Sequence, residues 1–118
     1  MRLRDEDYEI SFDKERGRVS FEGSLRLWHR QEYGKIRDFL LAAYAADLPR
    51  FELDFRRLEF LNSSGISTLC EFLLTARKLD RAPIVLIGNK SMLWQRRSLE
   101  NLQKLWDRIE VRLEDGQE

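Results

Sequence analysis

The stretch that decides the fold is "LEFLNSSGISTLCEF", residues 58–72. It begins like a strand, with apolar and polar residues alternating, and it ends with apolar residues at the spacing of a helix. The junction between the two patterns is formed by Asn62, Ser63, Ser64 and Gly65. A strand that passes directly into a helix is the repeating unit of α/β proteins, whose sites collect at the carboxyl ends of strands. We therefore expect an α/β domain with a candidate site at this junction.

The residues before the junction predict a hairpin, a helix and a strand. Alternating apolar positions over 8–12 and 19–27 are separated by a short connection that contains Gly17, a residue suited to a positive φ, which favours a β-hairpin. From about residue 31 to 47 the apolar spacing becomes helical and ends before a proline. The alternation returns over 51–55, which predicts the next strand.

The residues after the junction predict two helices and two strands. "APIVLIG", residues 82–88, is a continuous apolar run of the kind found in strands buried on both faces. Ser91 is suited to cap the helix that follows. The expected inner positions of the two helices are Ile66, Leu69, Cys70, Leu73 and Ala76 for the first and Leu99, Leu102 and Trp106 for the second. A last alternating segment, 109–113, predicts a closing strand.

The predicted order is β-β-α-β-α-β-α-β. It implies a single domain over residues 1–118, with a core of about 8–113 and a polar tail at 114–118. Strand–helix–strand units require parallel strands with right-handed crossovers. We therefore expect a mixed, mostly parallel sheet of about five strands that is covered by three main helices.

Composition excludes several classes of function. Basic and acidic residues number 21 each, so no overall field attracts nucleic acid or an acidic membrane. The one cysteine, Cys70, excludes an internal disulfide and a cysteine-rich zinc site and favours a reducing compartment. The longest apolar run, "IVLI", is too short to span a membrane, and the charged first residues carry no signal core. These features predict a cytoplasmic protein.

Candidate catalytic residues are few. His29 is the only histidine, and no partner spacing for a catalytic dyad or a metal site accompanies it. Cys70 lies on an apolar helix stripe and is expected in the core. The sequence has no glycine-rich phosphate loop. We expect a binding module without cofactor or metal, not an enzyme. Trp28 and Trp94 are expected to pack in the core or at its rim, with a role as partner anchors as the alternative.

Two explanations fit the polar residues at the junction. Asn62 is a good helix N-cap and its side chain can accept a hydrogen bond from the first turn, which accounts for the motif as local structure. Alternatively, the first turn is a site for a negatively charged group, because it has unpaired amides and a partial positive charge. A phosphate ester on a serine there would add a charge of about −1.5 to −2 and expel a partner packed against that surface.

At these residues the sequence resembles a STAS domain, the family of sulfate transporters and anti-sigma-factor antagonists. The family motif is a strand, then Asp-Ser-Ser/Thr-Gly-Leu/Ile, then a helix, and "LEFLNSSGISTLCEFL" follows it with Asn62 in the place of the aspartate. "GSLRL", "PIVLIG" and "LENLQKLWDRIEV" also fall in family order, so the resemblance covers roughly residues 8–113. Asn62 keeps the capping geometry and lacks the charge of the usual aspartate.

The resemblance implies a bacterial anti-sigma-factor antagonist that is a phosphoprotein in transcription regulation. Its partners would be an anti-sigma factor that is a serine kinase with a GHKL-type ATPase fold, and a PP2C-type phosphatase. By position, the phosphoacceptor is Ser63, with Ser64 as the second choice. The expected partner-binding residues are Asn62, Ser63, Ser64, Gly65, Asn89, Lys90 and Ser91. The alternatives are an unphosphorylated scaffold subunit of a STAS assembly and a STAS module that senses a small ligand or nucleotide.

Overall fold

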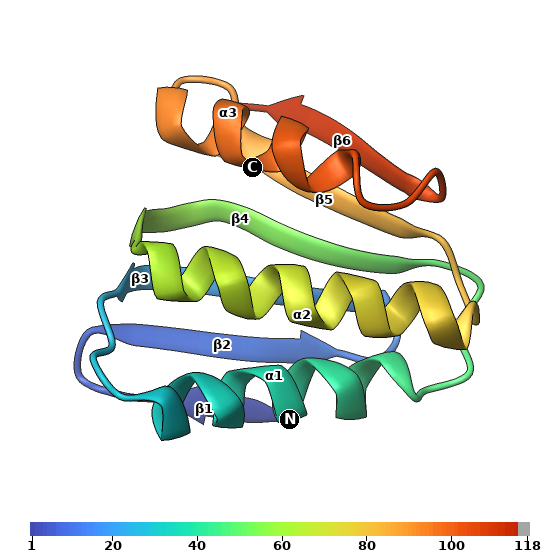
Figure 1. The fold of residues 1–118 in the computed structure, drawn as a ribbon, viewed down its shortest axis with the longest axis horizontal. Helices are drawn as coiled ribbons and strands as arrows, with labels where there is room; N and C mark the ends of the chain where they lie inside the picture. Colours follow the sequence, from blue (N-terminus) through green and yellow to red (C-terminus); the bar gives the residue numbers. More distant parts are fainter. Residues whose placement is uncertain (116–118) are drawn as a thin grey trace.

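Six strands form one sheet in the order in which they follow along the chain, and three helices lie against one face of this sheet (Figure 1). The structure is a computed structural model that describes residues 1–115. The strands are β1 (Arg2–Arg4), β2 (Tyr8–Asp13), β3 (Arg18–Leu25), β4 (Phe51–Leu61), β5 (Ile84–Asn89) and β6 (Ile109–Glu114). The helices are α1 (Arg30–Tyr44), α2 (Ser63–Leu79) and α3 (Leu93–Gln103). None of these helices is long and apolar enough to cross a membrane.

The predicted mixed α/β sheet is confirmed. The hairpin β2–β3 is antiparallel with Gly17 at a φ of 68° in its turn, and β3, β4, β5 and β6 pair in parallel. Two boundaries were wrong. β1 is a sixth strand that pairs with β2 outside the expected core, and Glu114 belongs to β6, where it pairs with Asn89, and not to the tail. Residues 116–118 of the predicted tail lie outside the described residues.

β4 is about twice as long as the predicted 51–55 strand. The prediction ended too early because two bulges interrupt the alternation of buried and exposed residues. It carries one extra residue relative to β3 between Asp54 and Arg57, and another between Leu58 and Phe60. At each bulge, the next side chain that faces the core comes three residues further along the strand and not two. The fully buried positions of β4 that face the helices are Phe51, Leu53, Phe55 and Leu58. β4 therefore continues past the residues at which its alternating pattern ends. It places the start of α2 at the edge of the sheet where the parallel strands end.

Gln95 of α3 bonds the part of β4 that has separated from β5. The two strands pair only as far as Asp54 with Ile87, which leaves carbonyls of β4 without a ladder partner. The fully buried Gln95 amide donates to the carbonyls of Phe55 (2.6 Å) and Leu58 (2.8 Å). Its Oε1 accepts from the backbone N–H of Asn89 (2.7 Å). One glutamine side chain thus satisfies two buried carbonyls and one half-buried N–H, as buried polar groups require.

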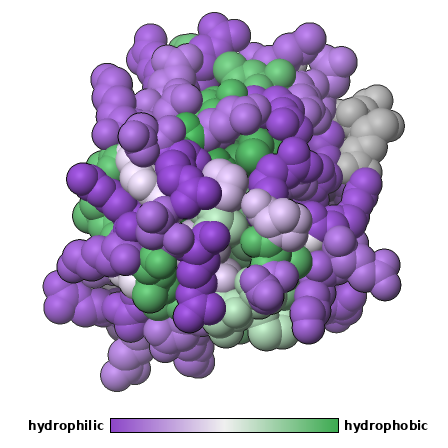
Figure 2. All heavy atoms as spheres, turned by 90° about the vertical axis from the view of Figure 1, so that its right-hand side faces the viewer, coloured by the Kyte–Doolittle hydropathy of each residue, from purple (hydrophilic) through white to green (hydrophobic). Residues whose placement is uncertain are grey.

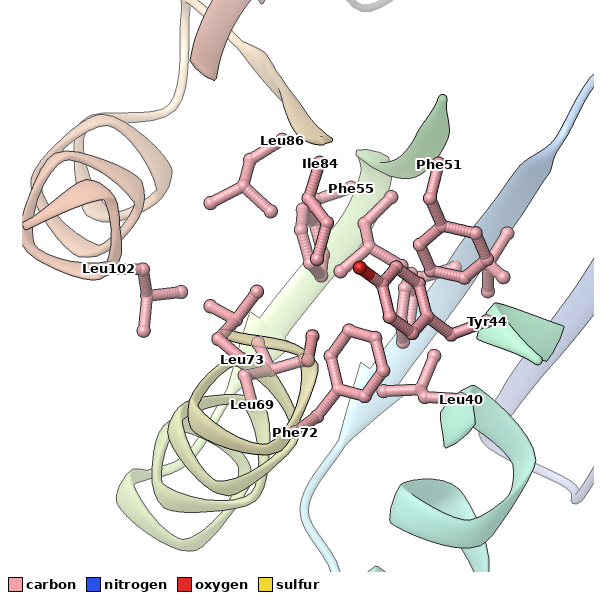
Figure 3. Packing of buried hydrophobic residues seen from close by; sticks show 14 of the residues in the cluster. Leu40, Tyr44, Phe51, Phe55, Leu69, Phe72, Leu73, Ile84, Leu86 and Leu102 are labelled. Atoms are coloured by element: carbon pink, nitrogen blue, oxygen red, sulfur yellow. The ribbon is translucent and has the colours of Figure 1, made fainter. Parts of the chain in front are cut away.

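The core lies between the sheet and the helices. In Figure 3, Tyr44 of α1 lies beside Phe51 of β4, and Phe72 of α2 and Leu40 of α1 lie on the same side of Phe51. Tyr44 makes edge-on ring contacts with Phe51 and Phe72, at centroid distances of 5.3 and 5.8 Å. Its hydroxyl donates to the carbonyl of Ala82 (2.7 Å), so this large side chain is buried without an unpaired polar atom.

Charged side chains cover the other face of the sheet. They form ion pairs across β3, β4 and β6 that involve Arg18, Glu52, Asp54, Arg56 and Glu114. Burial alone would raise the pKa of Asp54, but the hydrogen bonds and charge of Arg56, together with the charge of Arg18, hold it below its ordinary value. The middle of the helix-free face is therefore polar yet largely closed to water, in agreement with the burial of β5 on both sides.

We expect Gln95→Leu to lower the free energy of unfolding by roughly 2–4 kcal/mol, because it leaves two carbonyls and one amide buried without partners. Urea denaturation measures the change. The matched control is Arg96→Leu at the next, exposed position of α3, which is expected to stay within about 0.5 kcal/mol of the parent. A loss below about 1 kcal/mol for Gln95→Leu would show that β4 does not depend on this side chain.

Candidate functional site

The predicted junction lies where β4 passes into α2. α1 and α2 both begin at this edge of the molecule, on the left of Figure 1, where β3 and β4 end. Ser63 is the first residue of α2, and both Ser63 and Ser64 are exposed. The two candidate acceptors are therefore within reach of another macromolecule, as the phosphorylation hypothesis requires.

Gly65 is buried, although it was expected to contact a partner. A methyl group at this position would lie 2.2 Å from Cδ1 of Leu61 and 3.4 Å from a ring carbon of Tyr33. A side chain here would overlap with the end of β4, so glycine is required for the close approach of α2 to the sheet. Gly65 therefore shapes the surface from below and does not contribute a contact of its own.

Asn62 is the N-cap of α2, and both the oxygen and the nitrogen of its side-chain amide form hydrogen bonds. Oδ1 accepts from the backbone N–H of Gly65 (3.0 Å) and from the hydroxyl of Tyr33. Nδ2 donates to the carbonyl of Leu27 (3.1 Å), and the backbone N–H donates to the carbonyl of Leu25 (3.2 Å). An aspartate could make the cap but not the bond to Leu27, because a carboxylate has no N–H. The bond to Leu27 thus explains why position 62 is an asparagine and not an aspartate, which could not be predicted from the sequence.

Tyr33 of α1 completes this network. Its hydroxyl accepts from the backbone N–H of Leu27 (3.1 Å) and donates to Asn62. Burial raises the pKa of the Tyr33 phenol, so the group stays protonated and able to donate at neutral pH. The loop between β3 and α1 is thereby bonded to the start of α2, and the position of that loop is coupled to the position of Ser63.

Trp28, in this loop, is 90% exposed, so the expectation that it packs in the core or at its rim is wrong. It lines a groove between α1 and α2 whose other wall includes Ser64 and Ser67. Phe60, near the end of β4, is 40% exposed, and the Arg26 guanidinium lies 4.6 Å from the centre of its ring. Exposed aromatic residues beside a hydroxyl form the kind of patch that binds proteins.

Trp94 connects α3 to the same edge. Its indole N–H donates to the carbonyl of Glu59 in β4 (3.1 Å), and the side chain is half-buried, as a residue at the core's rim. The preceding residue, Leu93, is 57% exposed. We define the Ser63 surface as Trp28, Phe60, Ser63, Ser64 and Leu93.

The opposite ends of α1 and α2 look different. Figure 2 shows the face on the right-hand side of Figure 1, and hydrophilic residues cover most of it. The Ser63 surface lies at the other end of these helices, where Trp28, the most exposed large apolar side chain of the described residues, lies at the same edge as the candidate acceptors.

The second predicted contact group follows β5. Asn89 is half-buried and Lys90 and Ser91 are exposed, with Lys90 paired to Asp115 (3.2 Å). Their role in partner binding stays a prediction. Ser91 does not cap α3: its backbone N–H donates to the Asn89 side chain (2.9 Å), and Met92 is the N-cap residue without a side-chain bond. The cap prediction was wrong because the Asn89 side chain forms a local turn with the backbone of Ser91, and the helix begins after Met92.

The remaining candidates have structural positions. His29 is exposed at the N-cap of α1 and makes no capping bond. Cys70 is half-buried against the core, where burial raises the pKa of its thiol. Trp106 is buried, but it follows the end of α3 and does not belong to the helix face where it was expected. Residues 1–115 contain no cluster of three histidine, cysteine or acidic side chains that could hold a metal ion.

Comparison with known proteins identifies the fold. No family model and no curated protein matches the sequence. SiaC of Pseudomonas aeruginosa matches with a TM-score of 0.69 at 19% identity, over 98% of this chain and 97% of that chain. A chain in the complex of the P. aeruginosa diguanylate cyclase SiaD with its activator SiaC gives 0.68 at 19%, over 97% and 99%. An anti-sigma factor antagonist from Mycobacterium paratuberculosis gives 0.64 at 18%, over 92% and 90%. The chain has the STAS-like fold that the sequence predicted.

We expect Asn62→Asp to destabilise the protein by about 1 kcal/mol. The substitution keeps the cap and gains a favourable charge at the helix start, but it places a carboxylate oxygen against the carbonyl of Leu27. Thermal unfolding at neutral pH measures the difference. Tyr33→Phe, which removes the neighbouring hydroxyl, should cost a similar amount. An Asn62→Asp variant that is more stable than the parent would contradict the role given to the side-chain amide.

Proposed function

We propose that this chain is a regulatory protein-interaction module of the anti-sigma-factor antagonist type. Its partner docks on the Ser63 surface and leaves when Ser63 is phosphorylated. The observation that carries the proposal is an exposed serine hydroxyl at the first residue of α2, at an edge of the molecule that also carries the exposed side chains of Trp28 and Phe60.

The position of Ser63 suits a phosphate group without a change of fold. The first turn of a helix has backbone amides that lack intrahelical acceptors, and the aligned peptide dipoles favour negative charge there. α2 has no acidic residue in its first turn, so no existing charge opposes a phosphate. Phosphorylation therefore changes the charge of the surface and leaves the helix in place.

The neighbours of Ser63 make the same phosphate incompatible with a docked partner. Trp28, Phe60 and Leu93 are large and exposed, and such side chains contribute to binding when a partner covers them and excludes water from them. A dianion on Ser63 at the same edge would have to lose its water under a partner that offers it no matching charge, which costs several kcal/mol. Docking and phosphorylation therefore exclude each other.

The structural relatives support the partner classes. An anti-sigma factor antagonist shares this fold, which supports an anti-sigma factor as the partner. The GHKL-type ATPase fold of that partner is what the resemblance of the sequence to STAS domains implies. In the proposed cycle, this partner transfers a phosphoryl group from ATP to the hydroxyl of Ser63, and a PP2C-type phosphatase removes it. The cycle takes place in the cytoplasm, where the anti-sigma factor and its sigma factor meet.

A second candidate partner follows from the other relatives. SiaC, which shares the fold over nearly the whole chain, is the activator of a diguanylate cyclase. The Ser63 surface would then dock on a cyclase and not on an anti-sigma factor, with the same dependence on the charge of Ser63. Identification of the bound partner by mass spectrometry separates the two candidates.

We expect Ser63→Asp to weaken partner binding at least about 100-fold, whereas Ser63→Ala keeps the parent affinity. Isothermal titration calorimetry with the identified partner measures both. The control is Asn101→Asp, which adds the same charge at an exposed position of α3 away from the Ser63 surface and should have no effect. Phosphosite mass spectrometry of the protein from its own cells should place the phosphate on Ser63.

Equal affinity of the Ser63→Asp and Ser63→Ala variants for the partner would contradict the proposal that the charge of Ser63 controls binding. Phosphate found on Ser64 and not on Ser63 would move the acceptor by one residue and contradict the assignment.

A further inference from the structure

The outer edge of β6 carries a pattern of charges that is complementary to itself. β6 is the last strand of the sheet and pairs on one side only, with β5. The backbone N–H groups of Ile84 and Lys90 donate to the carbonyls of Arg108 and Glu114, so the even-numbered residues of this segment direct their peptide groups to β5. In a parallel ladder the alternate residues then direct theirs away from the sheet. The peptide groups of Val111 and Leu113 thus form an open edge.

We propose that this edge pairs with β6 of a second copy, antiparallel and two-fold symmetric about Val111, which joins two sheets into one. The proposal does not depend on the function proposed above. In this register Val111 lies opposite Val111 of the second copy, and the two residues exchange both N–H···O bonds. Ile109 lies opposite Leu113, and Glu110 lies opposite Arg112, each pair occurring twice by symmetry.

Both faces of the joined sheet fit this pairing. Ile109, Val111 and Leu113 face the helices, where Val111 and Leu113 are half-buried beside a groove along α3. They would continue the apolar layer from one copy into the other. Glu110 and Arg112 occupy the non-hydrogen-bonded positions of the new ladder, where side chains approach most closely and opposite charges stabilise the pair.

The charges also select this register. A shift that centres the pairing on Glu110 places two glutamates opposite each other, and one centred on Arg112 places two arginines opposite each other. A shift by a single residue moves the apolar side chains to the charged face. One register is therefore favoured over its neighbours.

The edge strand at the other side of the sheet shows the contrast. β1 is three residues long, and pairing it with itself about Leu3 would place Arg2 opposite Arg4. Like charges on a short strand are a common protection of a sheet edge against unwanted pairing. β6 is six residues long and alternates the sign of its charges, so its edge lacks that protection.

Sedimentation velocity over a range of concentrations tests the proposal. We expect a concentration-dependent species of twice the 14.2 kDa chain mass. Val111→Pro should abolish it, because the ring removes an outward N–H while the bonds to β5 stay. Val111→Ala keeps that N–H and should still dimerise, and circular dichroism should show both variants folded.

A charge exchange gives a second, independent readout. Glu110→Arg alone and Arg112→Glu alone should each weaken the dimer about tenfold or more, since each places like charges together twice. The double variant restores opposite charges and should recover the parent affinity to within about threefold. A parent protein that stays at 14.2 kDa at every concentration would overturn the proposal, as would a dimer that none of these substitutions weakens.

Discussion

The hydrogen bonds of the Asn62 side chain hold the functional edge together. They join the cap of α2, the hydroxyl of Tyr33 in α1 and the carbonyl of Leu27 in the loop after β3. The hydroxyl of Tyr33 joins the same three segments, so their relative positions depend on the side chains of Asn62 and Tyr33 together. Such a network is strong when each donor and acceptor is satisfied, and no buried side-chain polar atom of residues 1–115 lacks a partner.

This network explains how a small domain can present an ordered surface for recognition. Trp28 is almost fully exposed on a loop, a position where a large side chain would usually be mobile. The bonds from Leu27 to Tyr33 and Asn62 order the loop directly beside it. Ordering before binding reduces the entropy that association must overcome. The proposed switch then needs only a change of charge at Ser63 on a surface that is already in place.

Much of this fold followed from periodicity. The hairpin, the apolar β5 and the strand–helix junction all have unbroken patterns, and Ser63 was placed at the start of a helix from sequence alone. The length of β4 was underestimated, although residues 58–61 resembled a strand, because two bulges break its alternation after residue 55. β1 was missed because three residues are too few to show a period. Gln95 reads as an ordinary polar helix residue, and only the separation of β4 from β5 reveals what it bonds.

The position of the candidate acceptors at a helix start was predictable from the sequence, and the surroundings of the candidate site were less so. Asn62, Ser63 and Ser64 were found because strand-to-helix junctions leave free amides at a known place. The exposure of Trp28 could not be predicted, because an aromatic residue near a helix start usually packs inward. Gly65 was misassigned to the surface, since the sequence does not show which side of the first turn faces the end of β4.

Amide hydrogen exchange at Leu27, compared between the unmodified and the Ser63-phosphorylated protein, tests the central claim most directly. This N–H donates to Tyr33 and reports on the bonds around Asn62. If the phosphate acts only through the charge of the surface, the protection of this amide will be the same in both forms. Protection that is lost on phosphorylation would contradict the account, because it would show that the switch works by breaking the network and not by repelling the partner.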